Sequence, residues 1–192
     1  LSQPALHGVT GRKGFTRELT EALAMLARLR RIVGAGPDSR DSRGAGREEP
    51  SWHVVDLCTG KGFLATLVAV LFPHFVVTAV DRRDGSYMPH YEAAGVTNLR
   101  YAQLDVLAPS FASELGGLID AEGGGARRTV VLGMHLCGLL SLRAVGLLQA
   151  LPTVAAVVLA PCCLPGQHRA EDTPPDVFKA LGHEAKYDRW CA

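Results

Sequence analysis

The chain of 192 residues is long enough for one domain with a hydrophobic core, and its 47% hydrophobic and 20% charged residues are typical of a soluble globular protein. A formal net charge of +1 does not favour attachment to nucleic acid or membrane through bulk charge, and no apolar run reaches the roughly 18 residues of a membrane span. The five cysteines are an odd number and two are adjacent, which argues against a disulfide framework. We therefore expect an intracellular, cytoplasmic protein, with the nucleus or an organelle as alternatives.

The chain divides into three segments by composition. Within residues 1–33, apolar side chains recur at helical spacing from Phe15 to Val33, which predicts an amphipathic helix. Residues 34–51 are rich in Gly, Ser, Arg and acidic residues and lack apolar periodicity, so we expect a flexible linker there. Residues 52–192 carry the remaining apolar pattern and form the predicted main domain.

Short apolar strands alternate with helices after residue 52. The predicted strands are residues 53–57, 75–81, 99–105, 129–135 and 155–160, and the predicted helices are residues 63–72, 89–94 and 139–151. The glycine-rich stretch 116–128 is expected to be a loop. This alternation predicts an α/β, Rossmann-like fold with a largely parallel sheet covered by helices on both faces.

The ends of the first three strands carry the residues of a predicted nucleoside site, because ligands bind at the carboxyl ends of parallel strands. The first strand ends in the turn Asp56-Leu57-Cys58-Thr59-Gly60-Lys61-Gly62, whose glycines let the backbone approach a ligand. The second ends at Asp81, which is suited to accept from both ribose hydroxyls, and the third at Asp105, which is placed to accept from an adenine amino group. Either Asp alone is more simply interpreted as a helix cap, whereas both beside a glycine turn favour a nucleoside.

Two nucleotide classes compete for this turn. Gly60-x-Gly62-x-x-Ala65, followed by Asp81, formally fits the dinucleotide fingerprint of an NAD-type oxidoreductase. Here, however, a polar turn that begins with Asp56 precedes the glycines, which suits a ligand with an α-amino group and no pyrophosphate. A P-loop is not favoured, because Gly62 stands where a Ser or Thr would follow the lysine.

The fourth and fifth strands end in Gly133-Met134-His135-Leu136-Cys137-Gly138 and Ala160-Pro161-Cys162-Cys163. If these strands are neighbours, their histidine and cysteines converge. His135 is then the best candidate general base, and Cys162 is a less favoured candidate nucleophile. The simpler interpretation is that the ring of His135 bonds a neighbouring loop and that the cysteines are small buried side chains. We predict no metal site, because adjacent cysteines alternate sides and no CxxC pair is present.

The segments DLCTGKGFL, GMHLCG and APCC resemble three signatures of a class I S-adenosylmethionine-dependent methyltransferase family. That family includes the zinc-finger-type tRNA 2′-O-methyltransferases and the methyltransferase domain fused to a glutathione-transferase-like domain. The resemblance spans residues 52–190 and implies S-adenosylmethionine as the cofactor and RNA, tRNA in particular, as the acceptor. The predicted cofactor-binding residues are Asp56, Cys58, Thr59, Gly60, Lys61, Gly62, Asp81, Asp105 and His135.

The sequence departs from this family in two ways. Cys58 stands where most class I enzymes have glycine. Only five of the usual seven strands can be placed, so the C-terminal hairpin is expected to be missing, which would leave a sheet edge for a protein partner to cover. An alternative function is therefore that of a degenerate methyltransferase fold acting as a binding or structural subunit without activity.

Overall fold

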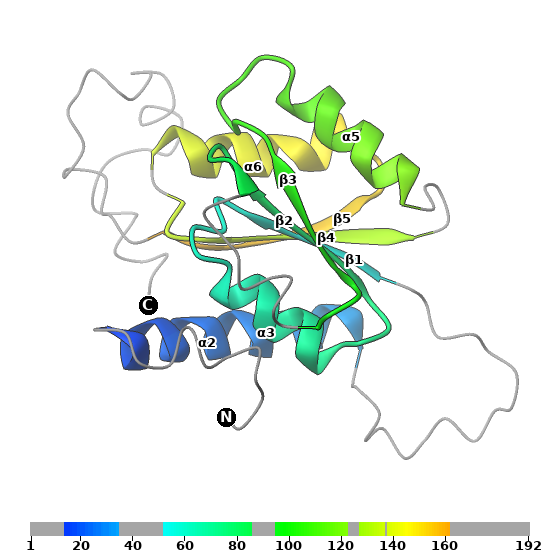
Figure 1. Ribbon diagram of the computed structural model, residues 1–192. Coiled ribbons are helices and arrows are strands. Elements are labelled where there is room, and N and C mark those ends of the chain that lie inside the picture. Colours follow the sequence, from blue (N-terminus) through cyan, green and yellow to red (C-terminus); the bar gives the residue numbers. More distant parts are fainter. Residues whose placement is uncertain (1–13, 35–51, 86–94, 123–126, 137, 162–192) are drawn as a thin grey trace, which may run out of the picture.

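The computed structural model describes residues 14–34, 52–85, 95–122, 127–136 and 138–161. Its strands are β1 (Trp52–Leu57), β2 (Val76–Asp81), β3 (Leu99–Gln103), β4 (Arg128–Met134) and β5 (Val154–Ala160). Its helices are α2 (Phe15–Val33), α3 (Phe63–Leu71), α5 (Phe111–Ala121) and α6 (Leu139–Ala150). Figure 1 shows α2 and α3 on one face of the sheet and α5 and α6 on the other.

The strands form one sheet in the order β3-β2-β1-β4-β5, and every pairing is parallel. All six residues of the central strand β1 are buried, because helices cover both faces of the sheet. The chain runs outward from β1 to β3 and then returns to place β4 on the other side of β1. This reversal of strand order beside β1 is where open parallel sheets bind ligands. The predicted α/β, Rossmann-like fold is thus confirmed.

The predicted N-terminal helix is confirmed as α2, and it packs on the sheet as part of the domain core. Ala22, Met25, Leu26 and Leu29 are buried in the apolar cluster that also contains α3. Full burial of Leu26 and Leu29 contributes roughly 3–6 kcal/mol before conformational entropy is counted. The amino-terminal half of α2 lies below the carboxyl ends of the strands in Figure 1.

The stretch 116–128 is not all loop, and that prediction was wrong for its first part. The helix α5 continues to residue 121. Phe111, Leu115 and Ile119 are spaced four residues apart and are all buried, so their packing outweighs the helix penalty of roughly 1 kcal/mol per glycine. Gly116 packs closely here, because a Cβ there would lie 3.0 Å from Cδ2 of Leu151, whose side chain would have to shift by a few tenths of an ångström.

Several predicted segments lie outside the described residues: the linker 34–51 beyond Gly34, the helix over residues 89–94, and everything after residue 161. The prediction that the C-terminal hairpin is missing therefore stays a prediction. Among the helices that are described, none is both long and apolar enough to cross a membrane.

A buried histidine makes the stability of this sheet sensitive to acid. His53 in β1 is 1% exposed, and its Nε2 lies 2.8 Å from the hydroxyl of Thr78 in β2. Burial, helped by the positive charges of Arg127 and Arg100, lowers the pKa of His53 from 6.5 to about 4. Between these two pH values, His53 is protonated in the unfolded chain but not in the folded chain. Folding stability is therefore lost as the pH falls from 6.5 towards 4.

Replacing His53→Leu together with Thr78→Val should remove this acid sensitivity. The free energy of unfolding of the double variant, relative to wild type, should rise by about 3 kcal/mol between pH 7.5 and pH 4. Urea unfolding at both pH values measures the difference, with the exposed His74→Ala as the control that should not show it. An equal acid response in wild type and the double variant would show that His53 is not held neutral by burial.

Candidate functional site

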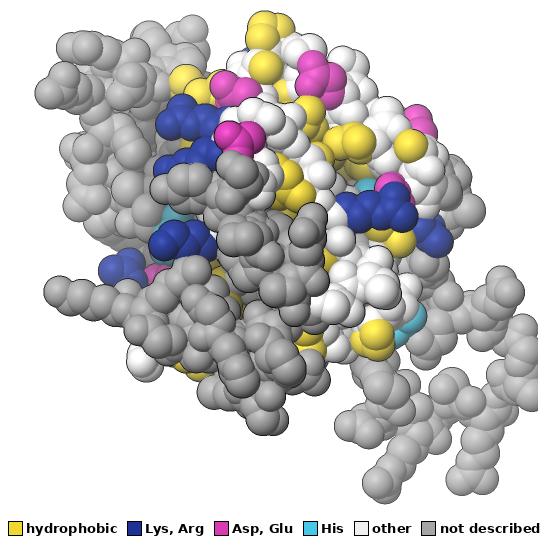
Figure 2. All heavy atoms as spheres, in the orientation of Figure 1, with side chains coloured by type: hydrophobic (Ala, Val, Ile, Leu, Met, Phe, Trp, Pro, Cys, Tyr) yellow, Lys and Arg dark blue, Asp and Glu magenta, His cyan; other side chains and the backbone are white. Residues whose placement is uncertain are grey.

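Charged side chains surround the carboxyl ends of the strands. Lys61 lies in the loop after β1, Arg82 and Arg83 follow β2, and all three are exposed. Arg143 of α6 is also exposed, and its Nη2 donates to the carbonyl of Leu107, after β3, at 3.4 Å. Figure 2 shows Lys and Arg side chains grouped at this end of the molecule, beside Asp and Glu. The end of the sheet where a ligand is expected therefore has a rim of Lys and Arg side chains interspersed with carboxylates.

The turn after β1 folds tightly around Thr59. The Thr59 hydroxyl donates to Oδ2 of Asp56 at 2.6 Å, and the Thr59 amide donates to the carbonyl of Val80 at 3.0 Å. Gly60 and Gly62 have φ angles of 58° and 69°, the left-handed region that glycine adopts without strain. The predicted glycine turn is thus present, and it ends at the first residue of α3.

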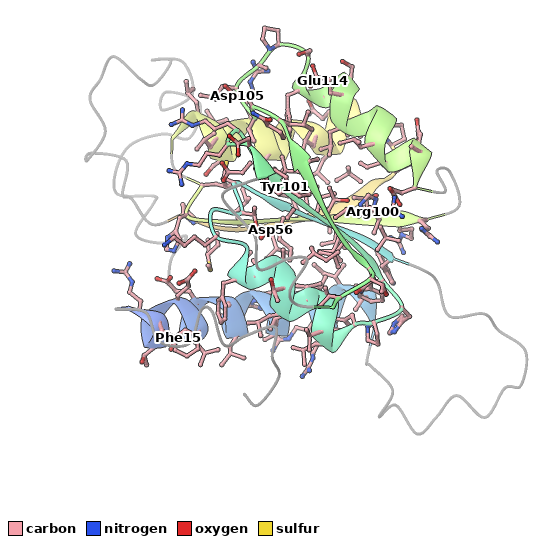
Figure 3. All side chains as sticks on the ribbon, in the orientation of Figure 1. Phe15, Asp56, Arg100, Tyr101, Asp105 and Glu114 are labelled. Carbon is pink, nitrogen blue, oxygen red and sulfur yellow. The ribbon has the colours of Figure 1, made fainter. Side chains whose placement is uncertain are left out.

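Asp56 is a carboxyl group enclosed by protein at the base of this turn, and Figure 3 shows it between the sheet and α3. Its side chain is 2% exposed. Burial and the negative charge of Asp81 raise the pKa of Asp56 from 3.8 to about 7, although hydrogen bonds from Thr59 and Ala65 oppose the rise. None of the described residues supplies a positive partner for a carboxylate in this setting. A cationic group of a ligand would supply one and would hold Asp56 ionised.

Asp81 joins the ends of β1 and β2. Its Oδ2 accepts a hydrogen bond from the Gly60 amide at 3.0 Å, and its Oδ1 accepts one from the Arg83 amide at 3.1 Å. The bond to Arg83 is a local turn of the capping type, whereas the bond to Gly60 reaches 21 residues along the chain. A carboxylate offers about four acceptor positions, so Asp81 keeps capacity for ligand hydroxyls.

Asp105 lies two residues beyond the end of β3, on the connection to α5, rather than at the strand end itself (Figure 3). It is exposed, and its Oδ1 accepts from the Leu107 amide at 2.9 Å. This bond closes a local turn, and Asp105 does not cap α5, which begins at Phe111 with Ser110 as its N-cap residue.

Cys58 lies among the same carboxylates. Burial and then the charges of Asp81, Asp56 and Asp105 raise the pKa of the Cys58 thiol from 9.0 to about 11. The thiol is therefore protonated and a poor nucleophile at neutral pH. Its φ of 52° is the left-handed conformation that glycine favours, which accounts for glycine being the usual residue at this position.

The ends of β4 and β5 are adjacent, as the prediction for His135 required. The His135 amide donates to the carbonyl of Ala160, the last residue of β5, at 2.8 Å. Leu136 folds back over Gly133, where an added Cβ would lie 2.2 Å from the leucine side chain. This reversal gives His135 a φ of 64° and leaves its side chain 42% exposed. Cys137, Cys162 and Cys163 lie outside the described residues.

A partner of His135 was missed at the sequence level. Nε2 of His135 lies 3.0 Å from Oε2 of Glu21, which comes from α2. The helix itself was predicted, and Glu21 directly precedes the buried Ala22. The position of Glu21 at the site depends on how α2 docks along the sheet, which the periodicity of a helix does not specify.

Within the described residues, no group of three or more His, Cys, Asp or Glu side chains is arranged to hold a metal ion. Because three cysteines of the predicted cluster lie outside those residues, the absence of a metal site stays a prediction.

Residues 37–168 match the model of a protein family described as a methyltransferase domain, and this match covers more than half of the chain. The chain belongs to this methyltransferase domain family. The match includes the turn after β1 and the ends of all five strands, but it leaves out α2 and therefore Glu21.

One similar solved structure is that of the plantazolicin methyltransferase BpumL in complex with SAH. It is 17% identical, with a TM-score of 0.40, and the match covers 81% of this chain and 51% of that chain. This chain thus spans about half the length of that protein's chain. No curated protein matches the chain.

Proposed function

We propose that this domain binds S-adenosylmethionine at the carboxyl ends of β1, β2 and β3 and transfers its methyl group to an acceptor. The observation that carries this proposal is the buried carboxyl of Asp56, which has no cationic partner among the described residues, beside a glycine turn that is bonded to Asp81. Asp56 would receive the positive α-amino end of the cofactor, Asp81 the ribose hydroxyls, and Asp105 the adenine amino group. When bound, the cofactor supplies a sulfonium whose methyl group is electrophilic.

The chain's own task is to hold the acceptor in line with that methyl group. Orientation of two reactants can supply much of the barrier reduction. His135, tied through its amide to the end of β5, lies beside the switch in strand order, and its ring would accept the proton that the acceptor loses. Cys162, which follows β5, is proposed only to border the acceptor, because a cysteine nucleophile would serve methylation at carbon rather than at oxygen or nitrogen.

The ribose role of Asp81 predicts a loss of cofactor affinity. Asp81→Ala should weaken binding of S-adenosylhomocysteine by about 10- to 150-fold, because charge-assisted hydrogen bonds of this kind are worth roughly 1.5–3 kcal/mol. Calorimetric titration measures the change, and Asp120→Ala, an exposed acid on α5, is the control that should bind normally. Unchanged affinity in Asp81→Ala would mean that this carboxylate only fixes the turns.

RNA is the proposed acceptor, and the rim of Lys61, Arg82, Arg83 and Arg143 supports it. A local group of cations contacts phosphates even where the net charge of the chain is close to zero. Transfer of a labelled methyl group from the cofactor to total cellular RNA, compared with total cellular protein, tests the acceptor class. Label in RNA that falls with rising salt is expected. Label found only in protein would show that the acceptor is a protein and not RNA.

The second candidate function is that of a binding or structural subunit without activity. The strained backbone of Cys58, where glycine is usual, supports it. The strand β5, which is outermost among the described strands and whose residues beyond Val154 are not fully buried, would then pair with a protein partner. Binding of S-adenosylhomocysteine without methyl transfer to any pool of RNA or protein would favour this function over the first.

A further inference from the structure

We propose that Glu21 of the N-terminal helix is a positioning residue for methyl transfer, which acts by holding the ring of His135; this inference rests on the proposed function of His135. The two side chains come from segments more than 100 residues apart, and only the docking of α2 on the sheet brings them together. Glu21 also lies outside the part of the chain that matches the family model. The helix would therefore complete the site as well as cover the sheet.

Glu21 is held so that one carboxylate oxygen is directed at His135. Its Oε1 accepts from Nε of Arg17 at 3.0 Å, one helical turn earlier, while its Oε2 faces Nε2 of His135 at 3.0 Å. The adjacent Ala22 is fully buried, and Met25 and Leu26 anchor the next turn. A side chain supported by a packed helix is placed more accurately than one supported by a loop.

The ring of His135 has few other constraints at this position. Its backbone is fixed by the bond to Ala160 and by the left-handed φ, but its side chain is 42% exposed and would rotate freely without a partner. A carboxylate facing Nε2 requires the proton of the neutral ring to be on Nε2. Nδ1 is then the nitrogen with a lone pair. Glu21 thus fixes both the orientation of the ring and the atom that accepts a proton.

The first test is spectroscopic and needs no activity. In ¹⁵N-histidine-labelled protein, the Nε2–H signal of His135, assigned by its loss in His135→Gln, should be protected from water exchange. It should broaden or disappear in Glu21→Ala and persist in Glu18→Ala, an acid one turn earlier on the same helix. A signal that is unchanged in Glu21→Ala would overturn the pairing.

The second test is kinetic. Glu21→Ala should lower kcat about 10- to 100-fold, with little change in the affinity for S-adenosylhomocysteine, as expected for loss of a carboxylate that orients a histidine. Glu21→Gln keeps an acceptor for the ring N–H and should recover most of that loss. In a His135→Ala background, Glu21→Ala should cause no further loss, because the carboxylate acts through the ring.

The outcomes separate this inference from the function on which it rests. A full additional loss in the double variant, or a lower melting temperature with normal kcat, would show that Glu21 only docks α2. If the wild-type chain neither binds S-adenosylhomocysteine nor transfers a methyl group, the proposed function fails. The positioning role then fails with it, while the ring signal still reports whether the two side chains are paired.

Discussion

Asp56→Asn should make the ligand-free protein more stable at alkaline pH and at the same time impair its binding of cofactor. Burial keeps the proton on folded Asp56 up to a pH of about 7, whereas the unfolded chain releases it near 3.8. For this raised pKa, the stability contributed by Asp56 is complete below pH 3.8 and is lost as the pH rises through 7. Asparagine has the same shape and no proton to lose. The variant should therefore exceed wild type by about 4 kcal/mol in free energy of unfolding at pH 8.5, and by little at pH 4.

The same substitution should weaken binding of S-adenosylhomocysteine at pH 8 by at least about tenfold, because the positive amino end of the ligand loses its counter-charge. Chemical unfolding at the two pH values and calorimetry at pH 8 measure the two effects. Asp120→Asn, an exposed acid, is the matched control for both. A variant that is no more stable than wild type at pH 8.5 would contradict the burial argument. One that binds normally would contradict the role of Asp56 in the site.

The acid and alkaline effects oppose each other in the wild-type chain. As the pH falls from 7 to 4, His53 lowers the stability while Asp56 raises it. The wild-type pH profile should therefore be flatter than the profile of either variant. The difference between each variant and wild type isolates the effect of one buried group, whereas the slope of wild-type stability combines both.

His135→Ala should reduce kcat about 10²- to 10⁴-fold, which is the usual contribution of a general base. The affinity for S-adenosylhomocysteine should change little, since the ring would act on the acceptor and not on the adenosine. Single-turnover transfer of a labelled methyl group, paired with calorimetry on the same samples, separates the two quantities. The control is His74→Ala, an exposed histidine just before β2.

Two results would count against this role for His135. Parallel loss of cofactor binding and turnover would place the ring on the cofactor side of the site. Turnover within a few fold of wild type would leave His135 with only its contact with Glu21, which is a structural role.

The positions of the strands and of the β1 turn could be predicted from sequence because local signals carry them. Buried parallel strands are nearly continuous apolar runs, and the left-handed residues at Gly60 and Gly62 need glycine. The helix α5 was missed because Gly116 and Gly117 lower helix propensity. The burial of Phe111, Leu115 and Ile119 that compensates depends on tertiary packing.

The electrostatics of the site could not be predicted in the same way. Asp56 was expected from its place in the turn, but its buried state depends on the layers that the fold puts around it. The contact of Glu21 with His135 depends on the docking of a helix across a stretch of chain with no periodic pattern. Sequence reasoning located the strands and placed Asp81 at a strand end, but it extended the third strand to Asp105, which lies two residues beyond the end of that strand. Pairings between elements far apart in the chain need the fold itself.

The most direct measurement of the central claim is a calorimetric titration of the wild-type chain with S-adenosylhomocysteine and, separately, with NAD⁺. The acid-then-glycine turn, the buried Asp56 and the bond between Gly60 and Asp81 predict binding of S-adenosylhomocysteine at one site per chain and no binding of NAD⁺. Heat of binding with NAD⁺ and none with S-adenosylhomocysteine would contradict the cofactor assignment. It would show that the glycine turn is a dinucleotide-binding turn.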